Sequence, residues 1–140
     1  MPFVRITVRS DTDQASRRAI ADSAHKALVA ALGVPQGDRF QIIDDRPESA
    51  MIFDRDYLDG DRRNVVCIEI TLSRGRTEET KRRLYKTLVA ELAEVGVRPD
   101  DVFVMLHEIN RADMSFGKGE IQTLDEPLLR KYGWRAPEGV

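Results

Sequence analysis

The sequence predicts an α/β (α+β) fold, in which two tandem β-α-β units form a four-stranded sheet with two helices on one face. Apolar residues alternate with a period of two in several short runs, as in strands, and recur at helical spacing between these runs. The two halves also share short sequences: residues 6–8 (ITV) match residues 70–72 (ITL), and residues 33–38 (GVPQGD) match residues 96–101 (GVRPDD). Internal similarity of this kind indicates a repeated supersecondary unit.

Length and composition favour a single globular domain over residues 1–140, with 41% hydrophobic and 33% charged residues. The net charge of −2 provides no basic field that would attract nucleic acid or a membrane surface. The single cysteine, Cys67, excludes an internal disulfide, and we expect a buried, unreactive thiol there. No charged-then-apolar pattern opens the sequence, so we expect no leader, and no apolar run approaches about 18 residues. We therefore expect a cytoplasmic protein.

The first unit begins with a strand over residues 3–8, in which apolar side chains alternate with others. Pro2 opens this strand, where a missing backbone N–H is least costly. A helix over residues 12–32 follows, because Ala, Ile and Leu recur there at helical spacing. Asp11 and Gln14 at its start resemble a capping box.

A strand over residues 40–43 completes the first unit, which spans about residues 2–45. The second unit, about residues 65–109, repeats the plan with three elements: a strand over residues 65–72, a helix over 77–95 and a strand over 102–109. Each unit is expected to pair its two strands in parallel through a right-handed crossover, so both helices cover the same face of the sheet.

The remaining segments are less regular. Residues 44–64 read as a long polar loop with room for one edge strand at residues 51–53, and loops of this length are often functional. Residues 115–119 carry a turn or hairpin signal, and residues 125–132 predict a short helix. The tail, residues 110–140, is apolar enough that we expect it to pack on a neighbouring subunit.

The sheet face away from the helices is predicted to be partly apolar. It carries Phe3, Cys67, Phe103 and Met105 among polar residues. An apolar surface of this size is rarely left in water, so the pattern predicts self-association.

Pro2 is the first candidate for chemistry. If the initiator Met is removed, the chain begins with a secondary amine tied to a strand, and a free α-amine titrates near about 8, much closer to neutrality than Lys. Such a nitrogen can act as an acid, a base or a nucleophile. A proline at position 2 is weak evidence alone, because about 5% of residues are proline.

Arg74 and Arg76 are the second candidate. They follow the strand over residues 65–72 with Gly75 between them, just before a helix N-terminus that favours anions. Two residues apart in an extended segment, their guanidinium groups are expected to point the same way, and such groups bind a carboxylate in a bidentate manner. The alternative is a solvated loop.

The alternation of strand positions links these candidates to an aspartate. Pro2 is an even number of residues from the apolar residues of its strand and so has the same parity as they do; the same holds for the arginine pair and its strand. Asp38 has the parity of Phe40 and Ile42. We therefore expect Pro2, Asp38, Arg74 and Arg76 to extend the helix-facing side of their strands.

Other chemistries find little support. His25 lies mid-helix as a partly buried surface residue, and His107 shares a strand face with Phe103 and Met105. Two distant histidines without a cysteine cluster argue against a zinc site. The chain has no glycine-rich phosphate motif and no nucleophile elbow.

Together, the N-terminal proline, the duplicated units and the Arg-x-Arg sequence resemble the tautomerase superfamily, and in particular its malonate semialdehyde decarboxylase group. The family's catalytic proline matches Pro2, and its two arginines match Arg74 and Arg76. Its aspartate, in Gly-Val-Pro-x-x-Asp-Arg-Phe/Tyr-Gln, matches Asp38. Residues 112–117 (ADMSFG) resemble the family's Ala-Asp-Trp-Ser-Phe-Gly, with Met114 in place of Trp.

The resemblance implies a tautomerase-like fold, a homotrimer and no metal or organic cofactor. It implies decarboxylation of a short 3-oxo acid, malonate semialdehyde, to acetaldehyde and CO2. Its catalytic residues would be Pro2, Asp38, Arg74 and Arg76, and its substrate-binding residues would be Arg74, Arg76, Met114 and Phe116. The substitution at Met114 alters the expected pocket wall.

Two alternatives remain open at this level. One is a keto-enol tautomerase, isomerase or hydratase that acts on a small 2-oxo or unsaturated acid, such as phenylenolpyruvate, with the same proline. Here a neutral Pro2 would carry the proton, whereas a cationic Pro2 favours decarboxylation or hydration. The other is a non-catalytic trimeric binding protein.

Overall fold

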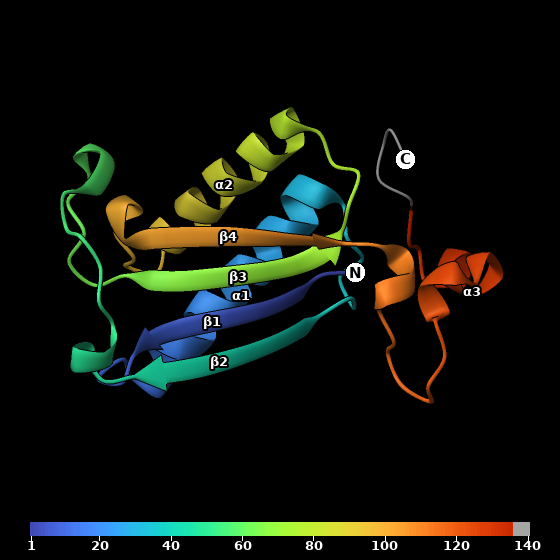
Figure 1. Ribbon diagram of the computed structural model, residues 1–140, viewed down its shortest axis with the longest axis horizontal. Helices are drawn as coiled ribbons and strands as arrows, with labels where there is room; N and C mark the ends of the chain where they lie inside the picture. Colours follow the sequence, from blue (N-terminus) through green and yellow to red (C-terminus); the bar gives the residue numbers. More distant parts are fainter. Residues whose placement is uncertain (136–140) are drawn as a thin grey trace.

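The computed structural model describes residues 1–135 and shows the predicted four-stranded sheet with two helices on one face (Figure 1). Residues 136–140 of the predicted tail lie outside the described residues. The strands are ordered β2-β1-β3-β4. The main elements are β1 (Phe3–Arg9), α1 (Gln14–Leu32), β2 (Phe40–Arg46), β3 (Val66–Ser73), α2 (Glu78–Ala93), β4 (Val102–Ile109) and α3 (Glu126–Lys131).

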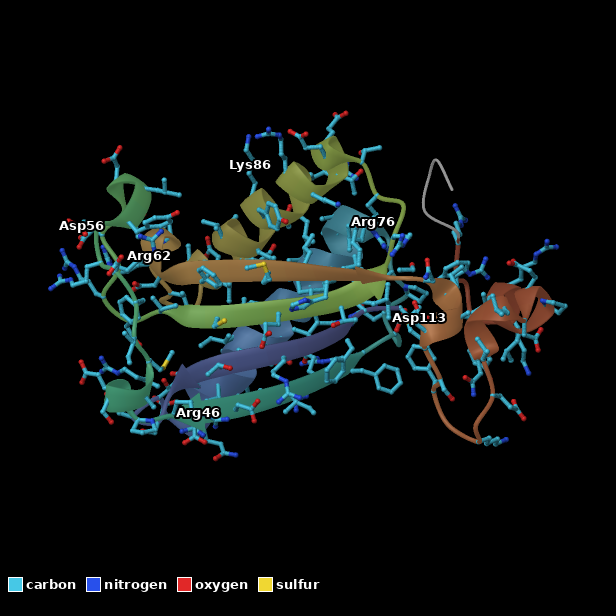
Figure 2. All side chains as sticks on the ribbon, in the orientation of Figure 1. Arg46, Asp56, Arg62, Arg76, Lys86 and Asp113 are labelled. Carbon is cyan, nitrogen blue, oxygen red and sulfur yellow. The ribbon has the colours of Figure 1, made fainter. Side chains whose placement is uncertain are left out.

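The two units meet in an antiparallel arrangement. β1 pairs in parallel with β2, and β3 in parallel with β4, whereas β1 and β3 run in opposite directions. The first strand therefore starts at the end of the sheet where the third strand finishes. Figure 2 shows Arg76 and Asp113 at this end, and Arg46, Asp56 and Arg62 at the other. Topology thus brings the start of the chain close to the loop after β3.

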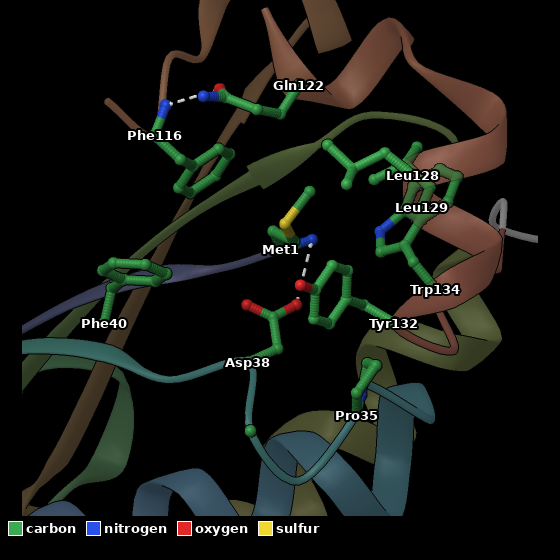
Figure 3. A pocket seen from close by; sticks show the side chains of 11 residues that line it. Met1, Pro35, Asp38, Phe40, Phe116, Gln122, Leu128, Leu129, Tyr132 and Trp134 are labelled. Atoms are coloured by element: carbon green, nitrogen blue, oxygen red, sulfur yellow. Dashed lines mark hydrogen bonds and ion pairs between the residues drawn. The ribbon is translucent and has the colours of Figure 1, made fainter. Parts of the chain in front are cut away.

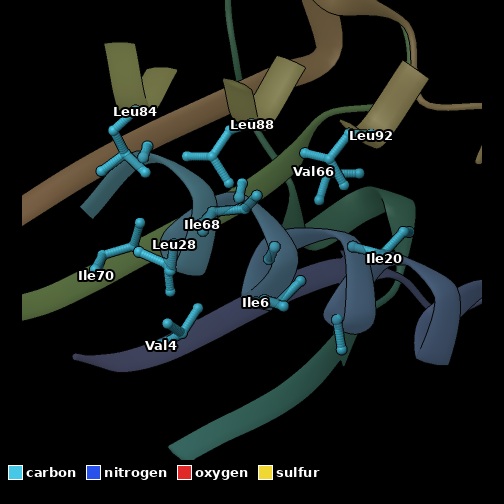
Figure 4. Close-up of a cluster of buried hydrophobic side chains, with 14 of the residues drawn as sticks. Val4, Ile6, Ile20, Leu28, Val66, Ile68, Ile70, Leu84, Leu88 and Leu92 are labelled. Atoms are coloured by element: carbon cyan, nitrogen blue, oxygen red, sulfur yellow. The ribbon is translucent and has the colours of Figure 1, made fainter. Parts of the chain in front are cut away.

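The core lies between the sheet and the two helices (Figure 4). Alternate side chains of β1 and β3 and one stripe of each helix are fully or almost fully buried, including Val4, Ile6, Ile68, Ile70, Leu28, Leu84, Leu88 and Leu92. The buried side chains recur every second residue in the strands and at helical spacing in the helices, as the sequence predicts, and the two sets pack against each other. This packing fixes where each strand begins and ends.

The start of α1 differs from the prediction. Asp13, rather than Asp11, caps the helix: its backbone is extended, and its carboxylate accepts a hydrogen bond from Ser16 N at 2.7 Å. Asp11 instead pairs with Arg9. At the other end, Gly33 adopts the left-handed conformation (φ 67°) and its N–H donates to Val29 O, which ends the helix.

The predicted orientation of β2 is wrong for Phe40 and Ile42. Phe40 lies opposite Phe3, on the sheet face without helices, and Ile42 lies on that same face. Gln41 faces the helices instead, and its side chain donates to Ala21 O at 2.8 Å. Because β2 is an edge strand, its helix-facing side is only partly covered and tolerates a polar residue. The strand is also longer than predicted and ends at Arg46.

The segment between the units contains no strand at residues 51–53. It forms two short 3₁₀ turns, at Glu48–Ala50 and Tyr57–Asp59, and Ile52 is 95% exposed. Residues 115–119 make a turn without hairpin strands. The short helix predicted in the tail is present as α3.

The sheet face opposite the helices is partly apolar, as predicted. Phe3, Phe103 and Met105 are about 36–47% exposed there, together with Phe40. Cys67 is half-buried on the same face, and burial raises the pKa of its thiol. Across residues 1–135, we find no helix with the length and apolar character needed to cross a membrane.

Candidate functional site

The start of the chain lies in a pocket at one end of the sheet (Figure 3). The Met1 nitrogen is 3.7 Å from Asp38 Oδ2. Pro2 is fully buried and directly precedes β1, whose pairing on both sides holds it in place. Two of the predicted residues, Pro2 (through its neighbour Met1) and Asp38, therefore lie at the same end of the sheet.

Asp38 enters the site from the loop that links α1 to β2. The backbone N–H of Asp38 donates to Pro35 O at 2.9 Å, which closes a tight turn. Its side chain is only 7% exposed. Within residues 1–135, its carboxylate oxygens accept no hydrogen bond. Burial raises the pKa of this carboxyl, while the N-terminal amine and His25 oppose the rise.

The N-terminal amine is shifted in the opposite direction. Burial lowers the pKa of the Met1 amine, Asp38 raises it, and the positive charge of Arg76 lowers it further. The neutral form of the amine is thereby favoured relative to an exposed chain end. Arg76 lies close enough to influence this nitrogen.

The two arginines are placed differently. Arg76 is half-buried, its Nη1 donates to Ser73 O at 2.7 Å, and burial lowers the pKa of its guanidinium. Arg74 is exposed, and its backbone N–H donates to Ile109 O. Gly75 (φ 116°) turns the chain between them, so the extended geometry predicted for this segment does not form. Of these two arginines, Arg76 is the one whose charge acts on the amine within residues 1–135.

The tail forms the other side of the pocket, which has a volume of about 610 Å³. Phe116 packs on Phe40 with their ring centroids 5.3 Å apart. The remaining tail residues that line the pocket are Gln122, Leu128, Leu129, Tyr132 and Trp134. Met114 lies in an adjoining hollow of about 420 Å³, which shares Met1, Phe40 and Phe116 with the main pocket. The predicted residues Phe116 and Met114 thus flank the site.

Arg111 connects several parts of the tail. Arg111 Nη2 donates to Thr123 O and, at 2.8 Å, to Glu126 Oε1. Its guanidinium group lies 4.7 Å from the centre of the Trp134 ring. This role of Arg111 and the pocket residues after Phe116 are not predicted from the sequence. The only signal for them was the apolar character of the tail.

Both histidines are accounted for by local contacts. His25 is buried, more so than predicted, and its Nε2 lies 2.8 Å from Gln36 O. His107 lies on the open sheet face, 3.4 Å from Glu69. In the part of the chain that the structure describes, no three His, Cys, Asp or Glu side chains are grouped to hold a metal ion.

The opposite end of the sheet carries a related arrangement. Asp101, which corresponds to Asp38 in the second repeat, is buried and accepts hydrogen bonds from the backbone N–H groups of Arg63 (2.7 Å) and Asn64 (3.0 Å). These peptide groups lie where β3 is about to begin, as Pro2 lies where β1 begins. Here Oδ1 of the carboxylate accepts both backbone hydrogen bonds, and Oδ2 pairs with Arg98 Nη1 at 3.5 Å.

Comparison with known proteins shows extensive similarity. Two family models, both described as "Tautomerase enzyme", match residues 38–117 and 2–58. The "Probable tautomerase YrdN" of Bacillus subtilis (strain 168) is 39% identical, over 91% of this chain and 100% of its own length.

Solved structures give the same result. FG41 malonate semialdehyde decarboxylase, inhibited by 3-bromopropiolate, is 37% identical with a TM-score of 0.84, covering 96% of this chain and 99% of its own. A second malonate semialdehyde decarboxylase is 33% identical with a TM-score of 0.83, covering 89% and 98%.

Proposed function

Because this chain belongs to the tautomerase family, we propose that it is a decarboxylase of a short 3-oxo acid, converting malonate semialdehyde to acetaldehyde and CO2 through an N-terminal proline. One observation carries this proposal: a buried chain-terminal amine lies beside Asp38, within the electrostatic influence of Arg76. The similarity to two malonate semialdehyde decarboxylases supports the choice of reaction.

The proposal requires removal of Met1. The nitrogen of Pro2 would then be the chain-terminal amine, in a residue that is fully buried and held by β1. A secondary amine fixed in this way keeps its lone pair in one direction, which favours a single productive geometry for proton transfer.

In the proposed reaction, Arg76 and Arg74 bind the substrate carboxylate and hold the breaking C–C bond out of the carbonyl plane. As CO2 leaves, the bonding electron pair moves into the carbonyl group. Pro2 supplies a hydrogen bond or proton to the carbonyl oxygen, or forms an iminium with the carbonyl carbon. Protonation at carbon then gives acetaldehyde directly; in the iminium path the electron pair moves to the nitrogen instead, and water hydrolyses the protonated iminium to release acetaldehyde and free Pro2. Asp38 orients Pro2 or a water molecule.

Tautomerisation is the second candidate. Burial lowers the pKa of the Met1 amine, and a terminal Pro2 nitrogen would lie in similarly buried surroundings, which supports a neutral amine. A neutral amine is a base that can move a proton between carbon and oxygen of an enol acid such as phenylenolpyruvate. The relative from Bacillus subtilis is itself named a probable tautomerase. A titration of the N-terminal nitrogen by NMR separates the two, because a cationic Pro2 at neutral pH supports decarboxylation and a neutral one supports tautomerisation.

We also propose that the enzyme acts as a homotrimer in the cytoplasm, with each sheet packed against its neighbours. The exposed Phe3, Phe103 and Met105 support this assembly. A neighbouring subunit would also give the exposed Arg74 and the outer side of the tail a second contact surface.

Activity of the purified protein tests the proposal, after its intact mass has established the loss of Met1. We expect acetaldehyde from malonate semialdehyde, and a loss of about 10²–10³ in kcat/KM for Arg76→Gln, because a charged transition-state contact is removed. Pro2→Ala should lose activity as well. Arg82→Gln is the matched control, since Arg82 is exposed on α2 and pairs with Glu78.

Two results would contradict the proposal. One is full activity of both Pro2→Ala and Arg76→Gln on malonate semialdehyde and phenylenolpyruvate. The other is a mature protein that retains Met1, since its Pro2 nitrogen would then be an amide without basicity.

A further inference from the structure

We infer that the substrate range of this site extends beyond malonate semialdehyde to carboxylic acids with a medium-length apolar tail, alkyl or aryl, which lies under the C-terminal segment of residues 111–135. The inference rests on the proposed function, because it takes Arg76 as the anchor of the carboxylate. It concerns the part of the substrate beyond the carboxylate and the reacting carbonyl group.

The volume of the pocket is the first observation. At about 610 Å³, it falls within the range of about 300–1,000 Å³ that encloses drug-sized ligands. A three-carbon acid would leave most of this volume to water. The site is therefore larger than the proposed reaction alone requires.

The pocket wall is the second observation. Its tail side consists mainly of apolar groups: Phe116, Leu128, Leu129, Tyr132 and Trp134. Gln122 also lines it, but its Oε1 accepts from Phe116 N at 2.9 Å and its Nε2 donates to Gly117 O at 2.8 Å. The side-chain amide of Gln122 is thus hydrogen-bonded to the backbone. The amine, on which the charge of Arg76 also acts, provides a cationic group at the end of the pocket where Asp38 lies, so the pocket matches a molecule with one anionic head and one apolar tail.

Met1 is the third observation. Its unbranched side chain points into the pocket, as Figure 3 shows, and it lines both the main pocket and the adjoining hollow. The space beside the N-terminus therefore accepts a flexible apolar chain. Removal of Met1 takes away part of the wall between the two cavities and leaves this space to the substrate.

The tail is also built to stay in place. Arg111 links Thr123, Glu126 and Trp134, three points well separated in the segment. The apolar wall is thus braced by hydrogen bonds and a cation–π contact. A braced wall can discriminate between substrates by shape, whereas a loose one would adapt to each.

A series of inert straight-chain acids tests the inference without turnover. Calorimetry on the full-length protein would give Kd for propanoate, butanoate, hexanoate and octanoate. We expect Kd to fall about threefold to fourfold for each added methylene until the pocket is filled. Octanedioate should bind more weakly than octanoate, because its second charge would enter the apolar end.

Variants locate the effect in the tail. Leu128→Asn should flatten the dependence of Kd on chain length, and so should Tyr132→Ser, which alters an exposed residue and keeps the test valid if the first variant misfolds. Leu124→Asn is the matched control: Leu124 is in the same segment but does not line the pocket, and its series should equal that of the wild type. Arg76→Gln should weaken every acid by a similar factor.

The outcomes separate the two proposals. A Kd that is independent of chain length overturns the inference, even if malonate semialdehyde is decarboxylated. A steep dependence that Leu128→Asn and Tyr132→Ser remove supports the inference, even if neither decarboxylation nor tautomerisation is detected. A steep dependence that both variants retain places the tail elsewhere and also overturns it.

Discussion

Asp38 and Asp101 occupy matching positions in the two repeats, yet their surroundings give them different chemistry. Asp101 accepts two hydrogen bonds from backbone N–H groups. The oxygens of Asp38 face the N-terminal amine in a mostly apolar pocket, where burial raises the pKa of the carboxyl. The residue type is the same, but only Asp38 retains free acceptor capacity for a substrate, a water molecule or Pro2.

The raised pKa of Asp38 predicts how stability depends on pH. The folded state binds the proton of this carboxyl more tightly than the unfolded state does, so ionisation of Asp38 reduces stability as pH rises from the ordinary carboxyl pKa of about 4 through the raised value. We expect the free energy of unfolding of Asp38→Asn to equal or exceed that of the wild type at pH 7. The difference should shrink toward zero below about pH 4. Urea denaturation at both pH values measures it.

Asp13→Asn provides a control of opposite sign. A hydrogen bond from Ser16 N lowers the pKa of Asp13, so its charge stabilises the folded state above the ordinary carboxyl pKa and this contribution is lost as pH falls. The variant should therefore be less stable than the wild type at pH 7. If Asp38→Asn proves clearly less stable than the wild type at pH 7, burial is not the dominant influence on Asp38.

At the scale of elements, the loop between α1 and β2 sets the position of Asp38. The loop begins with Gly33 in a left-handed conformation and passes through the turn between Pro35 and Asp38. A residue with a Cβ is strained at such a φ, whereas glycine is not. The direction in which the chain leaves the helix therefore depends on this one glycine.

Gly33→Ala should lower the free energy of unfolding by about 1 kcal/mol. A Cβ at Gly33 would contact no other atom within 4 Å, so the loss would come from backbone strain alone. Gly37→Ala is the matched control in the same loop, because Gly37 has an ordinary φ and equally open surroundings. Chemical denaturation of both variants tests this, and equal stabilities would exclude the role assigned to φ.

The sequence predicts the elements of the core well because their burial alternates strongly. Val4, Ile6 and Val8 are buried while Phe3 and Arg5 are exposed, so the period of two is clear. The edge strand β2 lacks such contrast, since two isoleucines follow Gln41 and both faces are partly exposed. Parity therefore assigns the wrong side to Phe40 and Ile42.

The candidate site is predictable in part for a related reason. Pro2, Asp38 and Arg76 lie just outside the ends of regular elements, where sequence position and topology define location. The tail has no periodicity, and its structure depends on contacts between residues well apart in the chain, such as Arg111 with Thr123 and Glu126. No local sequence pattern predicts such contacts, so the residues of the pocket wall could not be identified from the sequence.

At the scale of the whole molecule, the open face of the sheet is the surface through which we propose that the chain assembles. The helices cover one face, and the other exposes a row of aromatic and aliphatic side chains across β1, β2 and β4: Phe3, Phe40, Ile42, Phe103 and Met105. In a trimer, this row would be covered by neighbouring chains.

Phe103→Lys should therefore shift the protein from trimer toward monomer, because a charge would be buried at each interface. Sedimentation velocity measures the change. Tyr85→Lys is the control, since Tyr85 is similarly exposed, at 37%, but lies on α2 on the other side of the molecule. A wild-type protein that sediments as a monomer, or a variant that sediments as the wild type does, would show that this face does not mediate assembly.

The antiparallel junction of β1 with β3 relates the two ends of the sheet by an approximate twofold axis. At the end of the sheet where Asp101 lies, the backbone N–H groups of Arg63 and Asn64 contact the carboxylate. At the other end, the N-terminal nitrogen lies in the equivalent position beside Asp38. A circular permutant whose translation started at Val65 would move a terminal nitrogen to Asp101 and join the original ends. If the proposed mechanism holds, the continuous backbone at Asp101 is what keeps the second half of the duplicated framework from the chemistry assigned to the first, and this permutant would exchange their roles.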